Sequence, residues 1–289
     1  MEHKADFAAL SQSHDLLTKS IDDTRVLLQN LTLLIIERTR REKQQRIIEA
    51  LRLAEMDERF LDELNAIENT CECIFSIPDD SGSSIARAKT VFKRWLLSTD
   101  VNDGILHISG PPGSGKSTLM NFICDHTRTI NELTFWAGTS RIVVSRYFFR
   151  GHGHVLQRTI RGLVRALLAT VLSQVPDEIP CVFPDRWKNW ENDILWTASD
   201  VKLSDQEIRP AFDLKIGNGN AYHKHKFCFF IDGLDELNDD GNTYSDLVDL
   251  LRKWVDESRG AIKICVSSRE LPVFQTRLPP NTRIRLLQD

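Results

Sequence analysis

A glycine-rich segment of the chain has the residue types and spacing that bind phosphate groups. The segment reads GPPGSGKST and fits the pattern G-x-x-x-x-G-K-[ST], with an apolar run before it at residues 105–109 and an amphipathic stretch after it at residues 117–123. Glycine lets the backbone pass close to an anion, and successive N–H groups at the start of a helix then point at the phosphates. We expect a phosphate-binding loop made by Gly110, Gly113, Ser114, Gly115, Lys116, Ser117 and Thr118.

Two side chains of this segment indicate the ligand. Lys116 supplies a positive charge for the β- and γ-phosphates of a nucleotide, and the Ser117 hydroxyl can ligate Mg²⁺. The alternative, an ordinary turn, does not explain the strand and helix patterns on both flanks. The predicted cofactors are ATP or GTP with Mg²⁺. Contacts to phosphate do not distinguish adenine from guanine, so the choice between ATP and GTP stays open. The sequence lacks the N-K-x-D pattern that recognises guanine in translation-type GTPases.

A second group of candidate residues follows the apolar run at residues 227–231. The run ends in the acidic sequence DGLDE, and an α/β sheet places functional groups at the carboxyl ends of its strands. Asp232, the first acid, is predicted to hold Mg²⁺ through its hydration shell. Asp235 or Glu236 is predicted to orient or deprotonate an attacking water. The alternative is a solvated acidic loop.

A third candidate is Arg269, which follows the apolar run ICVSS. At the end of a strand, its guanidinium could sense or stabilise the charge of a γ-phosphate. The alternative is an exposed surface arginine. Arg150, which ends the run YFF, is a weaker candidate because it could equally pair with a local carboxylate.

The elements that must position these residues alternate along the chain from residue 104 onward. Short β-branched or aromatic runs predict strands, and longer amphipathic stretches between them predict helices. Strands separated by helix-sized crossovers indicate a mostly parallel sheet covered on both faces. We therefore expect an α/β P-loop NTPase fold. Its predicted strands are residues 105–109, 142–149, 227–231, 262–267 and 283–286, and its predicted helices lie near residues 116–128, 156–175 and 244–257.

The N-terminal part of the chain differs from the rest. It contains no glycine or proline up to residue 70, and apolar residues recur at helical spacing. We expect an all-α signalling or assembly region at residues 1–77, a linker and lead-in helix at residues 78–103, and a nucleotide-binding domain at residues 104–289. The stripe of the first region is formed by Leu10, Leu17, Ile21, Leu28, Leu31 and Ile35.

Composition excludes several classes of protein. Lys plus Arg number 37 against 41 Asp plus Glu, which gives a net charge of -4 and disfavours a nucleic-acid partner. The longest apolar-leaning run, residues 26–36, has about half the length of a membrane span. The N-terminus lacks the pattern of a secretory signal, and the six cysteines lack the paired spacing of a zinc site. We expect a soluble cytoplasmic protein without a transmembrane segment.

Together these motifs resemble the NACHT-type signalling NTPases of the STAND class, and most of all fungal members that also resemble the N-terminal region of nephrocystin-3. The likeness covers about residues 50–286. It rests on the motifs GPPGSGKST, FCFFIDGLDE and ICVSSRE in that order. Three further segments support it: FKRWLLS, QRTIRGLVRALLATVLSQVP and MDERFLDELNAIENTCECIF.

The resemblance implies binding of ATP or GTP with Mg²⁺, a switch whose bound nucleotide sets the oligomeric state, innate-immunity-like signalling, and slow hydrolysis at most. By this resemblance Lys116 and Ser117 are the phosphate-loop residues, Asp232 is the metal-side acid and Arg269 is the sensor arginine. Members of the class usually continue into a winged-helix segment and then repeats, whereas this sequence stops at Asp289. We therefore expect a chain truncated or excised before the winged-helix segment.

Three functional hypotheses follow. The first is a Mg-nucleotide-binding regulatory module whose N-terminal helices self-associate or bind protein partners. The second is a metabolic P-loop kinase or nucleotide hydrolase, which would leave the N-terminal region unexplained. The third is an interaction scaffold that binds nucleotide without hydrolysing it. Slow nucleoside-triphosphatase activity stays open because Lys116, Ser117, Asp232 and Glu236 argue against a degenerate site.

Overall fold

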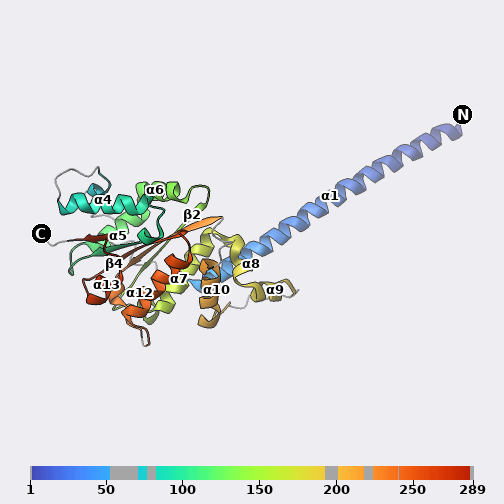
Figure 1. Ribbon diagram of the computed structural model, residues 1–289. Coiled ribbons are helices and arrows are strands. Elements are labelled where there is room, and N and C mark those ends of the chain that lie inside the picture. Colours follow the sequence, from blue (N-terminus) through green and yellow to red (C-terminus); the bar gives the residue numbers. More distant parts are fainter. Residues whose placement is uncertain are drawn as a thin grey trace. The chain divides into compact units, whose positions relative to one another are not determined.

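Five parallel strands form one sheet in the computed structural model, which describes residues 2–52, 71–76, 83–192, 201–217, 224–239 and 241–286 (Figure 1). The order across the sheet is β2-β3-β4-β1-β5, and every neighbouring pair is parallel. The expected α/β sheet is confirmed, and within the described residues it is wholly rather than mostly parallel. The strands are β1 Ile105–Ser109, β2 Arg141–Phe148, β3 His225–Asp232, β4 Ile262–Ser268 and β5 Arg283–Arg285.

Strand β4 lies between β1 and β3, although it comes last of the three in the chain. The register pairs Ile108 with Ser267 and Phe230 with Cys265, so the carboxyl ends of the three strands meet at one edge of the sheet. This edge receives the glycine-rich loop after β1, Asp232 at the end of β3 and Arg269 after β4.

The central strands are apolar on both sides because helices cover both faces of the sheet. In β3, Phe229 packs against Trp254 with ring centroids 6.2 Å apart. The next residue, Phe230, packs edge-on against Trp95 at 6.2 Å. Successive side chains of a strand point to opposite faces, so these two contacts mark the two halves of the core.

Helices cover both faces of the sheet, in one group on each face (Figure 1). The first group is α4 Ser84–Leu97, α5 Lys116–Asp125 and α6 Thr127–Ala137. The second group is α7 Ile160–Gln174, α10 Asp205–Gly217, α12 Tyr244–Glu257 and α13 Pro272–Arg277. Other elements of the described residues are α8 Ile179–Val182, α9 Pro184–Asn192 and the 3₁₀ turns Glu72–Phe75, Val101–Asp103, Val155–Arg158, Pro176–Glu178 and Leu234–Glu236.

The helix predicted near residues 116–128 is in fact two helices. His126 has an extended backbone conformation, with φ -68° and ψ 132°, which ends α5 at Asp125. Its imidazole Nδ1 accepts a hydrogen bond from the Arg128 N–H at 3.1 Å and so caps the start of α6. Histidine is a rare capping residue, so the sequence pattern did not indicate this break.

The chain divides into two compact units, Met1–Ile47 and Ile48–Asp289. The first consists of most of helix α1, Glu2–Leu51. Residues 53–70, within the predicted N-terminal region, and residues 78–82 of the predicted linker lie outside the described residues. The predicted limits at residues 77 and 103 therefore stay predictions. In the part of the chain that the structure describes, no helix combines the length and apolar character needed to cross a bilayer.

Candidate functional site

The phosphate-loop segment joins β1 to α5 in a tight turn that depends on glycine. Gly113 and Gly115 have φ angles of 77° and 79°, in the left-handed region that other residues avoid. Gly115 immediately precedes the first residue of α5. A Cβ atom at Gly110 would lie 2.6 Å from Ser114 Oγ and 2.7 Å from the Leu286 carbonyl oxygen. The loop therefore closes on itself more tightly than side chains would permit.

The loop and the end of β1 before it contain buried hydroxyl donors that suit an anion. Among the described residues, neither Ser109 Oγ nor Ser114 Oγ has a hydrogen-bond partner, although both atoms are buried. A buried hydroxyl without a partner is unfavourable, so a ligand that accepts its hydrogen bond stabilises the loop. A Cβ atom at Gly115 would meet no atom within 4 Å, which leaves space beside the N-terminus of α5. These features fit a phosphate group.

Lys116 is bound to its own loop. Its Nζ donates to the carbonyl oxygens of Gly110 and Pro111 at 3.0 and 2.7 Å. Burial lowers the pKa of Lys116, and the negative charges of Asp235 and Asp232 oppose this shift. The ammonium group thus lies within electrostatic reach of the acids that follow β3.

Asp232 is held at the end of β3 by a residue of the neighbouring strand. The carboxylate accepts a hydrogen bond from the Ser267 hydroxyl of β4, and the same hydroxyl accepts the Gly233 N–H at 3.0 Å. Asp232 is 1% exposed. Gly233, with φ 73°, turns the chain away from the strand. This arrangement fixes one carboxylate oxygen and orients the side chain at the carboxyl edge of the sheet.

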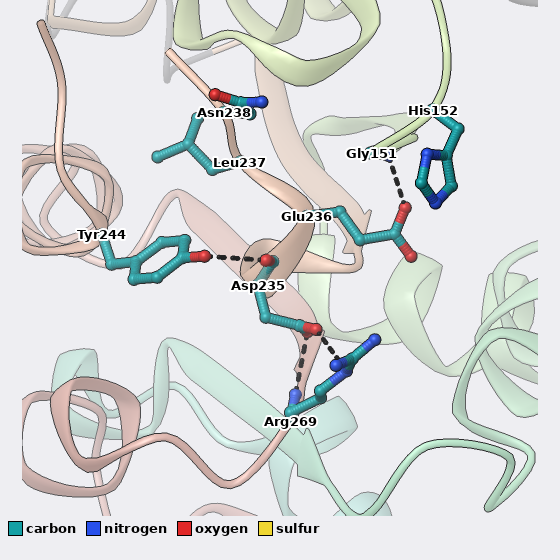
Figure 2. Close-up of a pocket in the computed structure, with 8 residues that line it drawn as sticks. All are labelled: Gly151, His152, Asp235, Glu236, Leu237, Asn238, Tyr244 and Arg269. Atoms are coloured by element: carbon teal, nitrogen blue, oxygen red, sulfur yellow. Dashed lines mark hydrogen bonds and ion pairs between the residues drawn. The ribbon is translucent and has the colours of Figure 1, made fainter. Parts of the chain in front are cut away.

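Asp235 and Arg269 form a two-point contact (Figure 2). The Arg269 backbone N–H donates to Asp235 Oδ1 at 2.9 Å, and Arg269 Nε lies 2.9 Å from Oδ2. The Asp235 side chain is 8% exposed, whereas that of Arg269 is 55% exposed. On the other side, the Tyr244 hydroxyl donates to the Asp235 carbonyl oxygen at 2.9 Å. The acid is therefore fixed, and the guanidinium reaches from it toward solvent.

Glu236 points toward the loop that follows β2. Its Oε2 accepts a hydrogen bond from the Gly151 N–H at 2.8 Å (Figure 2). This contact lies in a pocket of about 600 Å³. The pocket is lined by Gly151, His152, Asp235, Glu236, Leu237, Asn238, Tyr244 and Arg269.

The structure thus brings Asp235, Glu236 and Arg269 to one pocket. The phosphate-loop residues and Arg150 are not among the residues that line it. The charges of Asp235 and Asp232 raise the pKa of Lys116 against the larger lowering by burial. Gly151, Asn238 and Tyr244 were not predicted, because their part in the site depends on backbone groups and on the sheet order rather than on a motif.

Ser117 and Asp232 are the residues that could hold Mg²⁺. Mg²⁺ takes oxygen ligands and keeps several waters, so one or two protein side chains plus phosphate oxygens suffice. Over the described ranges, no group of three or more His, Cys, Asp or Glu side chains is arranged to bind a metal. The hydroxyl of Ser117 and the carboxylate of Asp232 are oxygen ligands of the kind that fits Mg²⁺ together with phosphate oxygens.

A buried histidine behind the site escaped the sequence analysis. Arg283 Nε donates to His107 Nδ1 at 3.2 Å, so the proton must be on Nε2, which lies 2.8 Å from Ser268 Oγ. The Ser268 hydroxyl in turn donates to the Arg269 carbonyl oxygen at 2.9 Å. Burial, with a smaller contribution from Arg283, lowers the pKa of His107 to about 3. A lone histidine in an apolar strand carries no pattern that would have indicated this chain of contacts.

A protein-family model matches this chain. The family described as "Nephrocystin 3, N-terminal" matches residues 81–269, a range that includes the phosphate loop, the acidic end of β3 and Arg269. No curated protein matches the chain.

Proposed function

Because the chain belongs to the nephrocystin 3 N-terminal family, we propose that it is a nucleotide-binding signalling NTPase module of the NACHT and STAND type. In this proposal it binds ATP or GTP with Mg²⁺, and the bound nucleotide acts as a regulatory switch. The observation that carries the proposal is the glycine-rich loop: among the described residues its buried Ser114 hydroxyl has no hydrogen-bond partner, and its Lys116 Nζ bonds to the loop carbonyl oxygens of Gly110 and Pro111.

The loop residues account for phosphate binding. The backbone N–H groups at the start of α5 and the Ser114 hydroxyl donate hydrogen bonds to phosphate oxygens. Lys116 leaves the carbonyl oxygens of Gly110 and Pro111, with which it now bonds, and neutralises phosphate charge. Ser117 and Asp232 would hold Mg²⁺, which when bound would neutralise charge on the phosphate oxygens.

The pocket residues account for slow hydrolysis at most. Asp235 or Glu236 orients the attacking water or accepts its proton, and Arg269 stabilises γ-phosphate charge. In the structure, however, Glu236 is bonded to the Gly151 N–H and Arg269 is paired with Asp235. The contact with Gly151 positions the Glu236 carboxylate through one of its two oxygens, and the guanidinium of Arg269 would exchange Asp235 for the γ-phosphate when a nucleotide binds.

Other parts of the proposal follow from the sequence and the resemblance. The N-terminal helices are proposed to mediate self-association or binding of protein partners. The protein is proposed to be a cytoplasmic, fungal member of the class. Binding of nucleotide would then favour one arrangement of the protein by making contacts that differ between two states.

The experiment is a titration of the chain with ATP and with GTP, each with and without Mg²⁺, together with measurement of phosphate release. Tight Mg²⁺-dependent binding with little turnover supports the switch and identifies the base. Rapid multiple turnover would favour a metabolic enzyme instead, and binding with no turnover over many hours would favour a scaffold. A folded chain that bound neither nucleotide would contradict the proposal.

A further inference from the structure

Helix α1 carries large apolar side chains that are exposed to solvent. Their exposed fractions lie between 53% and 67% over residues 16–36. Helices in proteins gain most of their stability from packing an apolar face, and clustered exposed apolar side chains mark interaction surfaces. The residues are Leu16, Leu17, Ile21, Val26, Leu27, Leu28, Leu31, Leu33, Leu34, Ile35 and Ile36.

Part of this set follows the spacing of a coiled coil. Starting at Leu17, steps of four and three residues alternate and define two rows. Ile21, Leu28 and Ile35 form the a row, and Leu17, Thr24 and Leu31 form the d row; we call these six residues the heptad stripe. A strict seven-residue repeat keeps the same face turned toward a partner helix along its whole length.

Thr24, the polar member of the heptad stripe, does not oppose burial. Its hydroxyl donates to the Ser20 carbonyl oxygen of the same helix at 2.7 Å. The hydroxyl is therefore satisfied within the helix, and the methyl group of the side chain can pack in an apolar seam.

We propose that α1 pairs with α1 of a second copy of this chain, as a parallel two-stranded coiled coil along the heptad stripe. Isoleucine at two of the three a positions and leucine at two of the three d positions resemble the combination, β-branched residues at a with leucine at d, that favours two parallel strands. In a parallel pair each stripe residue meets its own counterpart, so one helix supplies both complementary surfaces. This inference deepens the proposed self-association of the N-terminal part and rests on that part of the proposed function.

The area of the surface matches that of a stable dimer. Leu27 and Leu34 occupy the g positions beside the heptad stripe and widen it. Seven large apolar side chains that each bury roughly 100 Å² would remove about 700 Å² per helix from water, close to the roughly 800 Å² per partner of a standard interface.

The stripe has a defined end. The next two positions of the repeat after Ile35 are Arg38 and Glu42. They pair with each other within the helix, with Arg38 Nε 2.9 Å from Glu42 Oε1. Charged residues paired along one helix favour solvent, so the seam is expected to stop at Ile35.

The test compares two double variants of the full chain. In Leu31→Lys with Ile35→Lys, both changes fall on the heptad stripe. In Leu33→Lys with Ile36→Lys, the residue types and the added charges are the same, but both positions lie off the heptad stripe. The exposed fractions of these side chains, 64% and 59%, are close to those of Leu31 and Ile35, 53% and 64%. The mass in solution is measured by sedimentation across a concentration series, and nucleotide binding is titrated on the same proteins.

The expected result is a native chain and an off-stripe variant with the mass of two chains. The stripe variant is expected to have the mass of one chain, with its dissociation constant raised at least about 100-fold, because lysine charge would be buried in the seam. A native chain that stays monomeric at tens of micromolar would overturn the proposal. The heptad stripe would then have to bind a different protein. Equal behaviour of the two variants, or a mass above two chains, would also overturn it.

Orientation is tested by oxidation of single-cysteine additions in the full chain. Ile21→Cys should crosslink to a second copy in a parallel pair, beyond any crosslinking of the native chain, whereas Asp22→Cys should not. Absence of the Ile21→Cys crosslink in a dimer would overturn the parallel arrangement. Nucleotide affinity is measured separately from mass. Loss of nucleotide binding would contradict the proposed function, whereas loss of dimerisation would contradict the pairing through the heptad stripe.

Discussion

Arg269 contacts both carboxylate oxygens of Asp235, through its backbone N–H to Oδ1 and through Nε to Oδ2, each at 2.9 Å. The residue expected to meet a γ-phosphate and one of the two acids expected to orient a water therefore restrain each other. The carbonyl side of Arg269 is fixed as well, because it accepts the Ser268 hydroxyl. Only the guanidinium is free to exchange one anionic partner for another.

Asp235→Asn should release the guanidinium of Arg269. The amide oxygen can still accept the Arg269 N–H, but the ion pair is lost, so we expect the preference for nucleoside triphosphate over diphosphate to rise about tenfold. Arg269→Gln should lower it. Titration with both nucleotides measures the effect, and Asp213→Asn, which breaks the exposed pair with Arg209, is the control. If the preference for triphosphate over diphosphate were unchanged in both Asp235→Asn and Arg269→Gln, Arg269 would not contact the γ-phosphate.

Glu236→Gln should preserve nucleotide binding and slow hydrolysis by at least about 100-fold. The amide oxygen can still accept the Gly151 N–H, so the loop after β2 stays in place while the capacity to accept a proton is lost. Single-turnover phosphate release is the measurement. Unchanged turnover in Glu236→Gln would indicate that Asp235, not Glu236, accepts the proton.

Lys116→Ala should weaken nucleotide binding by roughly 100-fold or more, because a positive charge within the phosphate loop is lost. Lys93→Ala removes an exposed lysine of α4 and should have no effect. Calorimetric titration of both variants checks this. An intact affinity in Lys116→Ala would show that the loop does not bind the phosphates.

Acid should destabilise the fold through His107. Its pKa is lowered to about 3 in the folded protein, against about 6.5 in an unfolded chain. Between these values the unfolded state binds more protons, so stability is complete above about pH 6.5 and falls by up to about 1.4 kcal/mol per pH unit as the pH drops toward 3. Denaturant titrations at pH 7, 6, 5 and 4 measure the slope.

His107→Gln is the matched variant for this pH dependence, since glutamine can still accept from Arg283 and donate to Ser268 but does not titrate. Its stability at pH 7 should be lower than that of the native chain, while its decline from pH 6.5 to 4 should be shallower. Equal slopes for the two proteins would assign the acid sensitivity to other groups.

Two N-terminal deletions should behave differently. Removal of residues 1–46 should leave nucleotide affinity within about twofold and abolish self-association. Removal of residues 1–75 should also lower stability by about 2–5 kcal/mol, because Leu51 is fully buried and Arg165 donates to the carbonyl oxygens of Ala50 and Leu51. Denaturant unfolding and titration separate these effects. Equal stability of the two deletions would show that residues 47–75 do not contribute to the stability of the folded core.

Local patterns were sufficient for the central elements of the fold. The run at residues 105–109 became β1 with the same limits, and the helix predicted at 244–257 became α12 with the same limits. In each case a short apolar run or a strong amphipathic period lies between clear boundary residues, so neighbouring residues alone determine the element. The break at His126 was missed because it depends on one side chain capping a helix in a way that is uncommon for its type.

The candidate residues divide in the same way. The sequence by itself was sufficient to select the glycine-rich loop, the acids after β3 and Arg269 as candidates, because the types and spacing of these residues within short segments are typical of phosphate chemistry. The tertiary structure alone decided that β4 enters between β1 and β3, that Arg269 pairs with Asp235, and that His107 connects to Arg269 through Ser268. These contacts join residues far apart in the chain, and their partners are set by the packing of strands, a long-range property that no local pattern encodes.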